Sequence, residues 1–428
     1  MQTPEAFLSE NGFVTAAEIN RVALIGAFIS EMEKGLAGEP SSLAMIPTYV
    51  GVHGKVPVGA KAAVLDAGGT NFRSAVVSIP PKIENKLNQP MPGTKGAVDA
   101  DTFYAAFAKE IGRVSAYATV PKIGFCFSYP ADATPDLDAK LNCWTKGIQA
   151  PEIVGQYVGS ELMKRVGVGK IAIVNDTVAT LLAAKATEGD KTYSSYIGFI
   201  LGTGTNAAYV EKNVNIRKLQ NLPEDGMMII NAESGNFNKM KRSRFDEALA
   251  AKLSDGGHNP FEKMISGGYL GPLGLEVFKA AAKAGFFSEG AARKVMSLAQ
   301  LETMDFDNFL AAFRKEGRDN PLDAIFADAT DAQMARRLGL PIIERAAVLT
   351  AVHLAAFVIK TGEGADPAEP VAINADGSTY YKTRAIDFAG TVQRELDAML
   401  VKARNIHYAI TPQVDDAPMV GAGIAAML

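Results

Sequence analysis

An acidic residue and two glycines directly follow a short apolar run in the segment Asp66-Ala67-Gly68-Gly69-Thr70-Asn71-Phe72-Arg73. Glycine lets a backbone turn with positive φ and approach a phosphate within hydrogen-bond distance. A carboxylate at the end of a strand can hold hydrated Mg²⁺, and a nearby arginine can meet negative charge. The segment therefore predicts a phosphate-binding β-hairpin, although the same pattern is also ordinary hairpin chemistry.

A second glycine turn lies roughly a domain's length further along the chain. The apolar run Ile197 to Leu201 leads into Gly202-Thr203-Gly204-Thr205-Asn206, and the strand-like run Ala207 to Val210 follows it. Two strand–turn–strand segments of this kind predict a duplicated architecture that holds one nucleotide from both sides of a cleft.

The composition is that of an ordinary globular enzyme with room for two domains. The chain has 428 residues, of which 48% are hydrophobic and 21% are charged. Its formal net charge of -4 gives no support to nucleic-acid binding, which needs a basic face. Two cysteines, Cys126 and Cys143, exclude a disulfide framework and a zinc site built on cysteine.

We expect a cytoplasmic protein with no membrane partner. The first residues lack the basic and apolar parts of a signal peptide. The most apolar segment, Ala346 to Ile359, is too short and too polar to span a bilayer. The oligomeric state cannot be read from these features.

Strand and helix patterns alternate through the first half, and helical patterns dominate the second. The strand Ile171 to Val174 delivers Asn175 and Asp176 at its carboxyl end, where ligands gather in α/β sheets. The patterns predict strands over 62–79 (two strands), 122–128, 171–174, 195–211 and 226–231, and helices over 15–36, 101–118, 151–166, 178–186 and most of 245–349.

Four further segments join the two turns in a fixed order. They are Phe125-Cys126-Phe127-Ser128-Tyr129-Pro130 with Trp144-Thr145-Lys146-Gly147, then Ile173 to Thr180, then Asn231 to Gly235, and then Phe261 to Gly267. With these motifs the chain resembles a hexokinase of the actin-like ATPase superfamily, in the compact single-unit form. The resemblance is strong from about Leu65 to about Gly271 and thinner beyond.

The resemblance implies an α/β, two-lobed actin-like ATPase (ribonuclease H-like) fold with a central cleft. The small lobe would comprise residues 60–175 plus about 415–428, and the large lobe residues 1–59 and 176–414. The substrates it implies are MgATP and a hexose, most simply glucose. Closure of the lobes on the sugar would exclude water, which otherwise competes as the nucleophile.

On this resemblance Asp176 is the catalytic base that accepts the proton of the attacking 6-hydroxyl. Sugar hydroxyls are both donors and acceptors, so a specific pocket needs paired polar groups. The implied sugar contacts are Ser128, Thr145, Lys146, Asn175, Asp176, Asn206, Glu233 and Glu262. Taken singly, Asp176 also reads as a helix N-cap, and Glu233 and Glu262 as surface carboxylates.

The nucleotide side is implied in the same way. Asp66 would help to hold Mg²⁺, and Arg73 would neutralise developing charge. The two turns would cradle the phosphates, and weaker matches extend the site toward the carboxyl terminus. The implied nucleotide-binding residues are Asp66, Gly68, Gly69, Thr70, Asn71, Arg73, Gly202, Thr203, Gly204, Thr205, Gly267, Asp376, Gly377, Ser378 and Gly421.

The chain departs from the family pattern at three places near the sugar. Ala133 stands where a glutamine is usual, and Ser234 and Asn236 replace the expected tryptophan and alanine around Glu233. The loop before Phe261 is shortened to Asn259-Pro260, with apparent loss of a sugar-contacting glutamine. These changes bear on sugar selectivity and not on the type of reaction.

Three other classes of protein compete with this interpretation. A bacterial repressor-type sugar kinase typically carries a cysteine-rich zinc motif, which two separated cysteines cannot supply. A sugar sensor with low turnover would keep the pocket, but the intact Asp176 and both phosphate turns argue against it. An actin-like or chaperone-type ATPase leaves the signature of Ser128 and Thr145-Lys146 unexplained.

Overall fold

Two β-sheets with the same core strand order form the centre of the computed structural model, which describes residues 2–52, 54, 56–69, 71–115, 122–167, 170–186, 191–255, 257–314 and 316–428. The smaller sheet has the order β4-β3-β2-β5-β8. Strands β4, β3 and β2 pair antiparallel, whereas β2, β5 and β8 pair parallel. These strands are β2 (Lys61–Ala67), β3 (Asn71–Ser78), β4 (Lys82–Pro90), β5 (Lys122–Phe127) and β8 (Lys170–Val174).

The larger sheet repeats this pattern in the order β11-β10-β9-β12-β13, with β1 added at its antiparallel edge. Each glycine turn joins the first and second strands of its own repeat, so the predicted duplication is confirmed. The strands are β1 (Ile46–Pro47), β9 (Ser195–Leu201), β10 (Thr205–Lys212), β11 (Met227–Asn231), β12 (Val371–Asp376) and β13 (Tyr408–Ile410).

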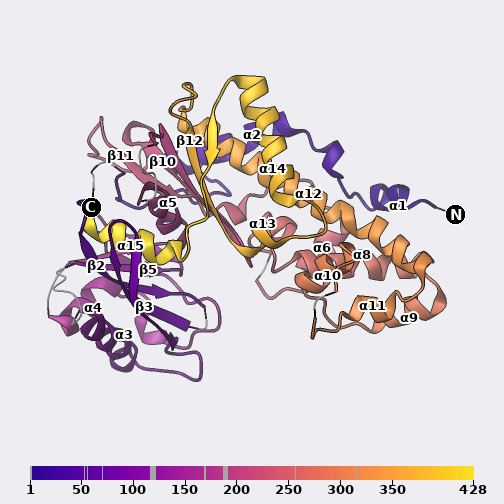
Figure 1. Ribbon diagram of the computed structural model, residues 1–428, viewed down its shortest axis with the longest axis horizontal. Coiled ribbons are helices and arrows are strands. Elements are labelled where there is room, and N and C mark those ends of the chain that lie inside the picture. Colours follow the sequence, from indigo (N-terminus) through magenta and orange to yellow (C-terminus); the bar gives the residue numbers. More distant parts are fainter. Residues whose placement is uncertain are drawn as a thin grey trace.

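Two helices lie between the sheets and pack against each other (Figure 1). Helix α5 (Asp176–Ala186) packs on β9, β10 and β12 of the larger sheet, and α15 (Ala417–Met427) packs on β2 and β5 of the smaller one. Their backbones approach so closely that a Cβ on Gly421 would lie 1.8 Å from the carbonyl oxygen of Ala179. This arrangement of paired sheets is the two-lobed actin-like fold predicted from the sequence.

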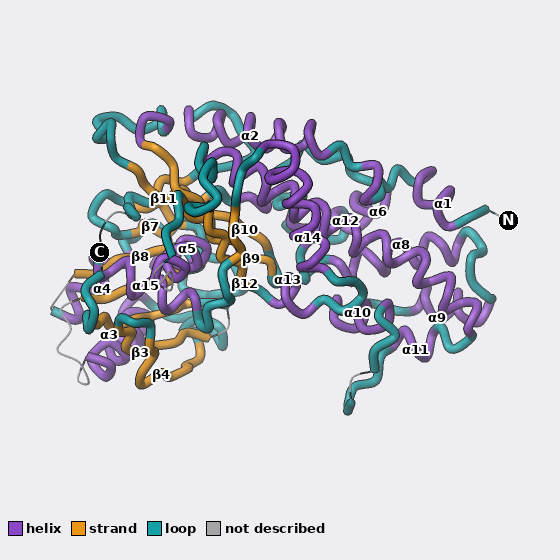
Figure 2. Tube along the Cα trace, turned by 45° about the horizontal axis from the view of Figure 1, so that its top comes forward, coloured by secondary structure: helices purple, strands orange, loops and turns teal. Residues whose placement is uncertain are grey.

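The remaining helices cover the outer faces of the sheets and extend the larger lobe. Helices α3 (Ala100–Ser115) and α4 (Val158–Val166) lie on the small lobe, where the rings of Phe103 and Phe107 enter the core. Figure 2 shows a mainly helical body, α8 to α11, on the side away from the small lobe. The other elements are α1 (Pro4–Glu10), α2 (Arg21–Ala37), α6 (Arg244–Ala250), α7 (Glu262–Ile265), α8 (Leu270–Lys283), α9 (Glu289–Ser297), α10 (Thr303–Leu310), α11 (Pro321–Ile325), α12 (Ala329–Thr361), α13 (Ser378–Lys382), α14 (Phe388–Leu396), the hairpin strands β6 (Ala131–Ala133) and β7 (Ala139–Leu141), four 3₁₀ turns (Ala16–Glu18, Pro151–Ile153, Asn213–Asn215, Ser234–Asn236) and a π-helical turn (Asp397–Lys402).

The apolar segment 346–359 belongs to the 33-residue helix α12, so the expectation that it is too short to span a bilayer was wrong. Among the described residues, α12 alone is long and apolar enough to do so, and 89% of its most apolar stretch is buried inside the protein. Helices α2, α8 and α14 pack against it. Its hydrophobicity is thus accounted for by the core.

Two predicted helices begin later than expected. Over 151–166 the chain first makes a 3₁₀ turn, then Gly155 adopts a φ of +83°, and α4 starts only at Val158. Over 15–36 the helix starts at Arg21, because the Asn20 side chain accepts a hydrogen bond from the Ala23 amide and caps it.

Candidate functional site

The carboxyl end of β8 and the start of α5 place Asn175 and Asp176 next to each other. The helix is capped by Asn175, whose Oδ1 accepts the Thr177 amide over 2.9 Å. The Asp176 carboxylate accepts only the Thr177 hydroxyl among described protein donors, at 3.3 Å. The alternative that Asp176 is merely the N-cap is therefore wrong, and its carboxylate remains available for chemistry.

A cavity of about 530 Å³ lies between the two sheets. The small lobe contributes Thr145 and Asn175 to its wall, and the large lobe contributes Glu233. The structure thus brings three of the eight predicted sugar contacts, from both halves of the chain, to the lining of one cavity. Polar residues that the sequence prediction missed also line it, namely Asn142, Asn231, Asn236, Asp255, His258 and Asn259.

Three side chains of the large lobe form a hydrogen-bonded chain at this cavity. Asn206 donates through Nδ2 to Asn231 Oδ1 over 2.8 Å, and Asn231 donates through Nδ2 to Glu233 Oε1 over 2.8 Å. Asn206 Oδ1 also accepts the Ser234 amide over 3.1 Å. Asn206 therefore orients Asn231, which lines the cavity. The amide of Ser234 in turn holds Asn206.

Glu233 and Glu262 are two half-buried carboxylates of the large lobe. Burial raises the pKa of Glu233, with Asp176 adding to the rise and with Asn231 and Lys146 opposing it. Burial also raises the pKa of Glu262, whose Oε2 accepts the Thr205 amide over 2.9 Å. The alternative that Glu233 and Glu262 are ordinary surface carboxylates is therefore wrong, because both are half-buried.

Lys146 links two segments of the small lobe. Its Nζ donates to the Ser128 carbonyl over 2.9 Å, and its backbone has a φ of +59°. A positive φ is uncommon outside glycine and is typical of functional turns. Lys146 thereby joins the segments of Ser128 and Thr145, which β7 and its hairpin partner separate along the chain.

The predicted β-hairpin is present, with Asp66 paired to Arg73 across β2 and β3. The Arg73 guanidinium also forms an ion pair with Asp66 and a second one with Asp416 over 2.8 Å. Burial raises the pKa of the Asp66 carboxyl and Arg73 opposes the rise. Arg73 thus pairs with two carboxylates. Gly68 and Gly69 form the turn between β2 and β3, which ends at Asn71, and Thr70 lies outside the described residues.

The second turn is held by Glu262. A Cβ on Gly204 would lie 2.5 Å from Glu262 Oε2, so a larger residue here would displace the Glu262 carboxylate. The Thr205 hydroxyl is already donated to the Ile200 carbonyl over 2.9 Å, and its amide is donated to Glu262. Thr203 is the hydroxyl of this turn that faces a cavity.

That cavity, of about 830 Å³, lies on the other side of the second turn. The predicted nucleotide-side residues Thr203, Gly267 and Ser378 all line it. Asp376 does not line it, because its Oδ1 accepts the Gly377 amide over 2.8 Å and so shapes the turn before α13. Other lining groups that the sequence prediction missed are Thr303, Asp307, Phe313, Lys382 and Arg384.

Gly421 is fully enclosed between α15 and α5. Its close contact with Ala179 is enough to explain why this position is glycine, and no ligand is needed for the explanation.

The carboxylates of the described residues fit a metal ion that is bound together with phosphates, and not one held by protein side chains alone. No cluster of three or more His, Cys, Asp or Glu side chains arranged for a metal ion occurs in the described part of the chain. Mg²⁺ commonly takes one or two carboxylates and completes its shell with phosphate oxygens and water. Asp66, buried and next to the phosphate turn, fits that role.

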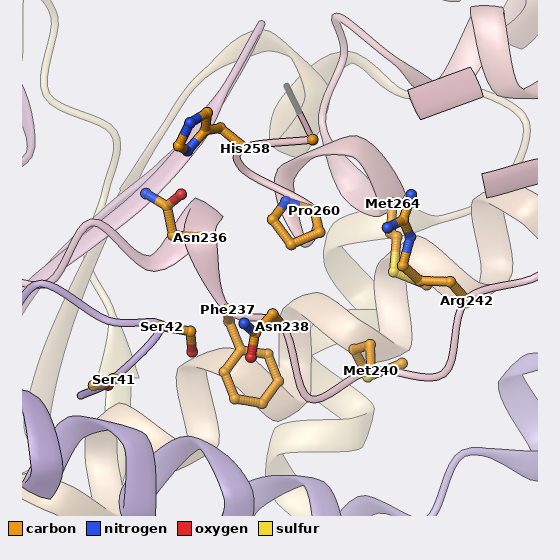
Figure 3. A pocket seen from close by; sticks show the side chains of 11 residues that line it. Ser41, Ser42, Asn236, Phe237, Asn238, Met240, Arg242, His258, Pro260 and Met264 are labelled. Atoms are coloured by element: carbon orange, nitrogen blue, oxygen red, sulfur yellow. The ribbon is translucent and has the colours of Figure 1, made fainter. Parts of the chain in front are cut away.

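The cavity of about 530 Å³, lined by the predicted sugar contacts Thr145, Asn175 and Glu233, is called the sugar-side cavity. A more polar cavity of about 450 Å³ adjoins it (Figure 3). The two share Asn236 and His258, which Figure 3 shows on one side of the space with Arg242 and Met264 on the other. Asn236 Oδ1 accepts the Asn259 amide over 3.2 Å. Two of the departures from the family pattern, Asn236 and the Asn259-Pro260 loop, therefore contact each other and border both cavities.

Two family profiles described as hexokinase match residues 13–186 and 196–428. The chain belongs to the hexokinase family. Hexokinase-1 of Nicotiana tabacum is 37% identical over 324 residues, which cover 68% of this chain and 62% of that protein. The glucokinase of Aspergillus niger is 29% identical over 436 residues, covering 85% and 84% of the two chains.

Solved structures of the hexokinase family share the fold. The hexokinase of Schistosoma mansoni complexed with glucose superposes with a TM-score of 0.76 at 24% identity, with all of both chains covered. The alignments span about three fifths of the length of the plant hexokinases, 62% for the tobacco protein and 61% for Hexokinase-7 of Oryza sativa.

Proposed function

We propose that this member of the hexokinase family transfers the γ-phosphoryl group of MgATP to the 6-hydroxyl of a hexose. The observation that carries the proposal is the position of Asp176. It lies at the end of β8 with its carboxylate free of capping, and Asn175 beside it lines a cavity that polar groups of both lobes surround. Glucose is the simplest substrate, as in the Schistosoma mansoni complex.

In the proposed mechanism Asp176 accepts the proton of the attacking hydroxyl and orients its oxygen. Thr145, Lys146 and Asn175 would bind sugar hydroxyls from the small lobe, and Glu233 and Glu262 from the large lobe. Because phosphoryl transfer is largely dissociative, most of the rate would come from positioning and charge stabilisation.

The phosphates would lie between the two turns, with Gly68 and Gly69 on one side and Gly202 to Gly204 on the other. Mg²⁺, held by Asp66 and phosphate oxygens, would neutralise charge on the transferred group. Arg73 would keep Asp66 in place through their ion pair. Sugar that bridges the two lobes would draw them together and exclude water from the transferred group.

The test is ATP turnover by the purified protein with Mg²⁺ and glucose, mannose, fructose or no sugar, for wild type and Asp176→Asn. We expect sugar-dependent ADP release with formation of sugar 6-phosphate. The substitution should lower turnover roughly 10²- to 10⁴-fold while sugar binding persists. Sugar binding without turnover in wild type would instead indicate a sensor, and turnover indifferent to sugar would indicate a general ATPase.

A further inference from the structure

Tyr129 connects the sugar-side segment to the phosphate hairpin. It directly follows Ser128, is only 4% exposed, and lines the sugar-side cavity. Its hydroxyl donates to the Gly68 carbonyl and lies 3.5 Å from the Gly69 carbonyl. One residue thus lines the sugar-side cavity and bonds to the glycine turn through its hydroxyl.

The bond to Gly68 has a consequence for the next amide. In a planar trans peptide the carbonyl and the following N–H point in opposite directions. A Gly-Gly turn has little steric barrier to rotation of its peptides. Tyr129 therefore selects one orientation of the Gly68–Gly69 peptide, and the N–H of Gly69 is directed away from the Tyr129 hydroxyl.

The sugar-side segment holds the Tyr129 ring in place. The ring packs edge-to-face on Trp144, with centroids 4.8 Å apart, and Lys146 Nζ lies 5.1 Å from its centroid. A Cβ on Gly69 would lie 3.6 Å from Lys146 Cδ, so the turn also adjoins this lysine directly. Burial raises the pKa of the Tyr129 hydroxyl well above its usual value, which keeps it a donor.

We propose that Tyr129 is a positioning residue that sets the Gly69 N–H for the phosphates and makes this setting depend on the segment that binds the sugar. The inference rests on the proposed function, because it assumes a nucleotide at the hairpin. It assigns to Tyr129 no contact with reacting atoms.

The test compares Tyr129→Phe with Tyr104→Phe. Both substitutions remove one buried hydroxyl in the small lobe and keep the ring, and Tyr104 donates instead to Gln156 over 3.0 Å on the outer side of the lobe. Three quantities are measured: KM for MgATP, the dissociation constant of a non-hydrolysable MgATP analogue by calorimetry, and that of glucose by the fluorescence of Trp144, the only tryptophan of the chain.

We expect Tyr129→Phe to raise KM for MgATP and the dissociation constant of the analogue about five- to ten-fold, the loss typical of one hydrogen bond. Glucose affinity should stay within two-fold of wild type, and Tyr104→Phe should change none of the three. Nucleotide affinity within two-fold of wild type, or an equal loss in Tyr104→Phe, would overturn the proposal. Because the titration with the analogue needs no turnover, it tests this inference even if the wild-type protein does not phosphorylate hexoses.

Discussion

The side chain of Asn231 donates to the Glu233 carboxylate over 2.8 Å and accepts from Asn206 over the same distance. Glu233 itself has a φ of +53°, so a strained backbone and a fixed amide together determine where its carboxylate points. Ser234, which stands at the expected tryptophan position, donates its backbone amide to Asn206 Oδ1 and so holds Asn206 in place.

Replacing Asn231 by leucine should weaken sugar binding. The change keeps the approximate volume but removes the donor to Glu233 and leaves the Asn206 amide unpaired, a loss of about 1–3 kcal/mol. We expect a roughly ten-fold higher glucose dissociation constant by Trp144 fluorescence. Asn238→Leu, at an exposed position nearby, is the control. Equal glucose affinity in the Asn231 variant and wild type would show that the amide chain does not orient Glu233.

Replacing Glu233 by glutamine should stabilise the protein in a pH-dependent way. Burial raises the folded-state pKa of Glu233 above the unfolded value of 4.5, so its contribution to stability is full below about pH 4.5 and is lost as pH rises through the folded pKa. Glutamine does not titrate. The variant should therefore gain stability over wild type as pH rises, on the order of 1 kcal/mol at pH 7.5.

Thermal unfolding of both proteins between pH 4 and 8 measures this difference. Exposed Glu39→Gln serves as the control and should follow the wild-type profile. A gain at pH 7.5 that is equally large at pH 4 would contradict the assignment to burial of the Glu233 charge. Glucose affinity should fall in the same variant, as expected of a residue kept for function at the expense of stability.

Replacing His353 by methionine should make the fold more stable, above all in acid. His353 is fully buried in α12 among Phe28, Phe261 and Phe357, and neither ring nitrogen has a hydrogen-bond partner in the described part of the chain. Burial lowers its pKa to about 3. Since the unfolded histidine titrates near 6.5, stability is lost as pH falls from about 6.5 toward 3.

The variant should be more stable by about 1–3 kcal/mol, and its stability should fall less steeply between pH 6.5 and 4. Urea unfolding at several pH values provides the measurement, with the partly exposed His407→Met as control. An unchanged pH profile would mean that other groups govern acid unfolding.

Replacing Gly421 by alanine should destabilise the protein by about 3 kcal/mol or more, because the new methyl group would collide with the α5 backbone at Ala179. Gly112→Ala, in the last turn of α3 with open space around it, should instead stabilise by up to about 1 kcal/mol. The unfolding midpoints are measured without nucleotide. An unaltered unfolding midpoint together with weaker nucleotide binding would indicate that Gly421 belongs to the nucleotide site and that its role is not helix packing alone.

Local sequence patterns were sufficient for the turns and for β2, β3, β5 and β8 to β11, but not for the sheet strands β4, β12 and β13. The runs before Asp66 and Gly202 are apolar and the residues after them are small, so strand, turn and returning strand follow from neighbouring residues alone. Helix starts were less well predicted. The side-chain cap at Asn20 and the positive φ of Gly155 displaced two starts, since a periodic apolar pattern does not reveal where the backbone first turns into a helix.

What the sequence by itself determined is the order of the motifs, and with it the hexokinase family, the two-lobed fold and the candidate residues on each lobe. The tertiary structure decided which residues meet: Asn231 with Glu233, Tyr129 with Gly68, Glu262 with the second turn, and Gly421 with Ala179. Apart from the first, these contacts join segments distant along the chain, and their side chains have no periodicity that signals a partner. They exist because burial between packed sheets and helices favours hydrogen-bonded polar groups and requires glycine where two backbones approach closely.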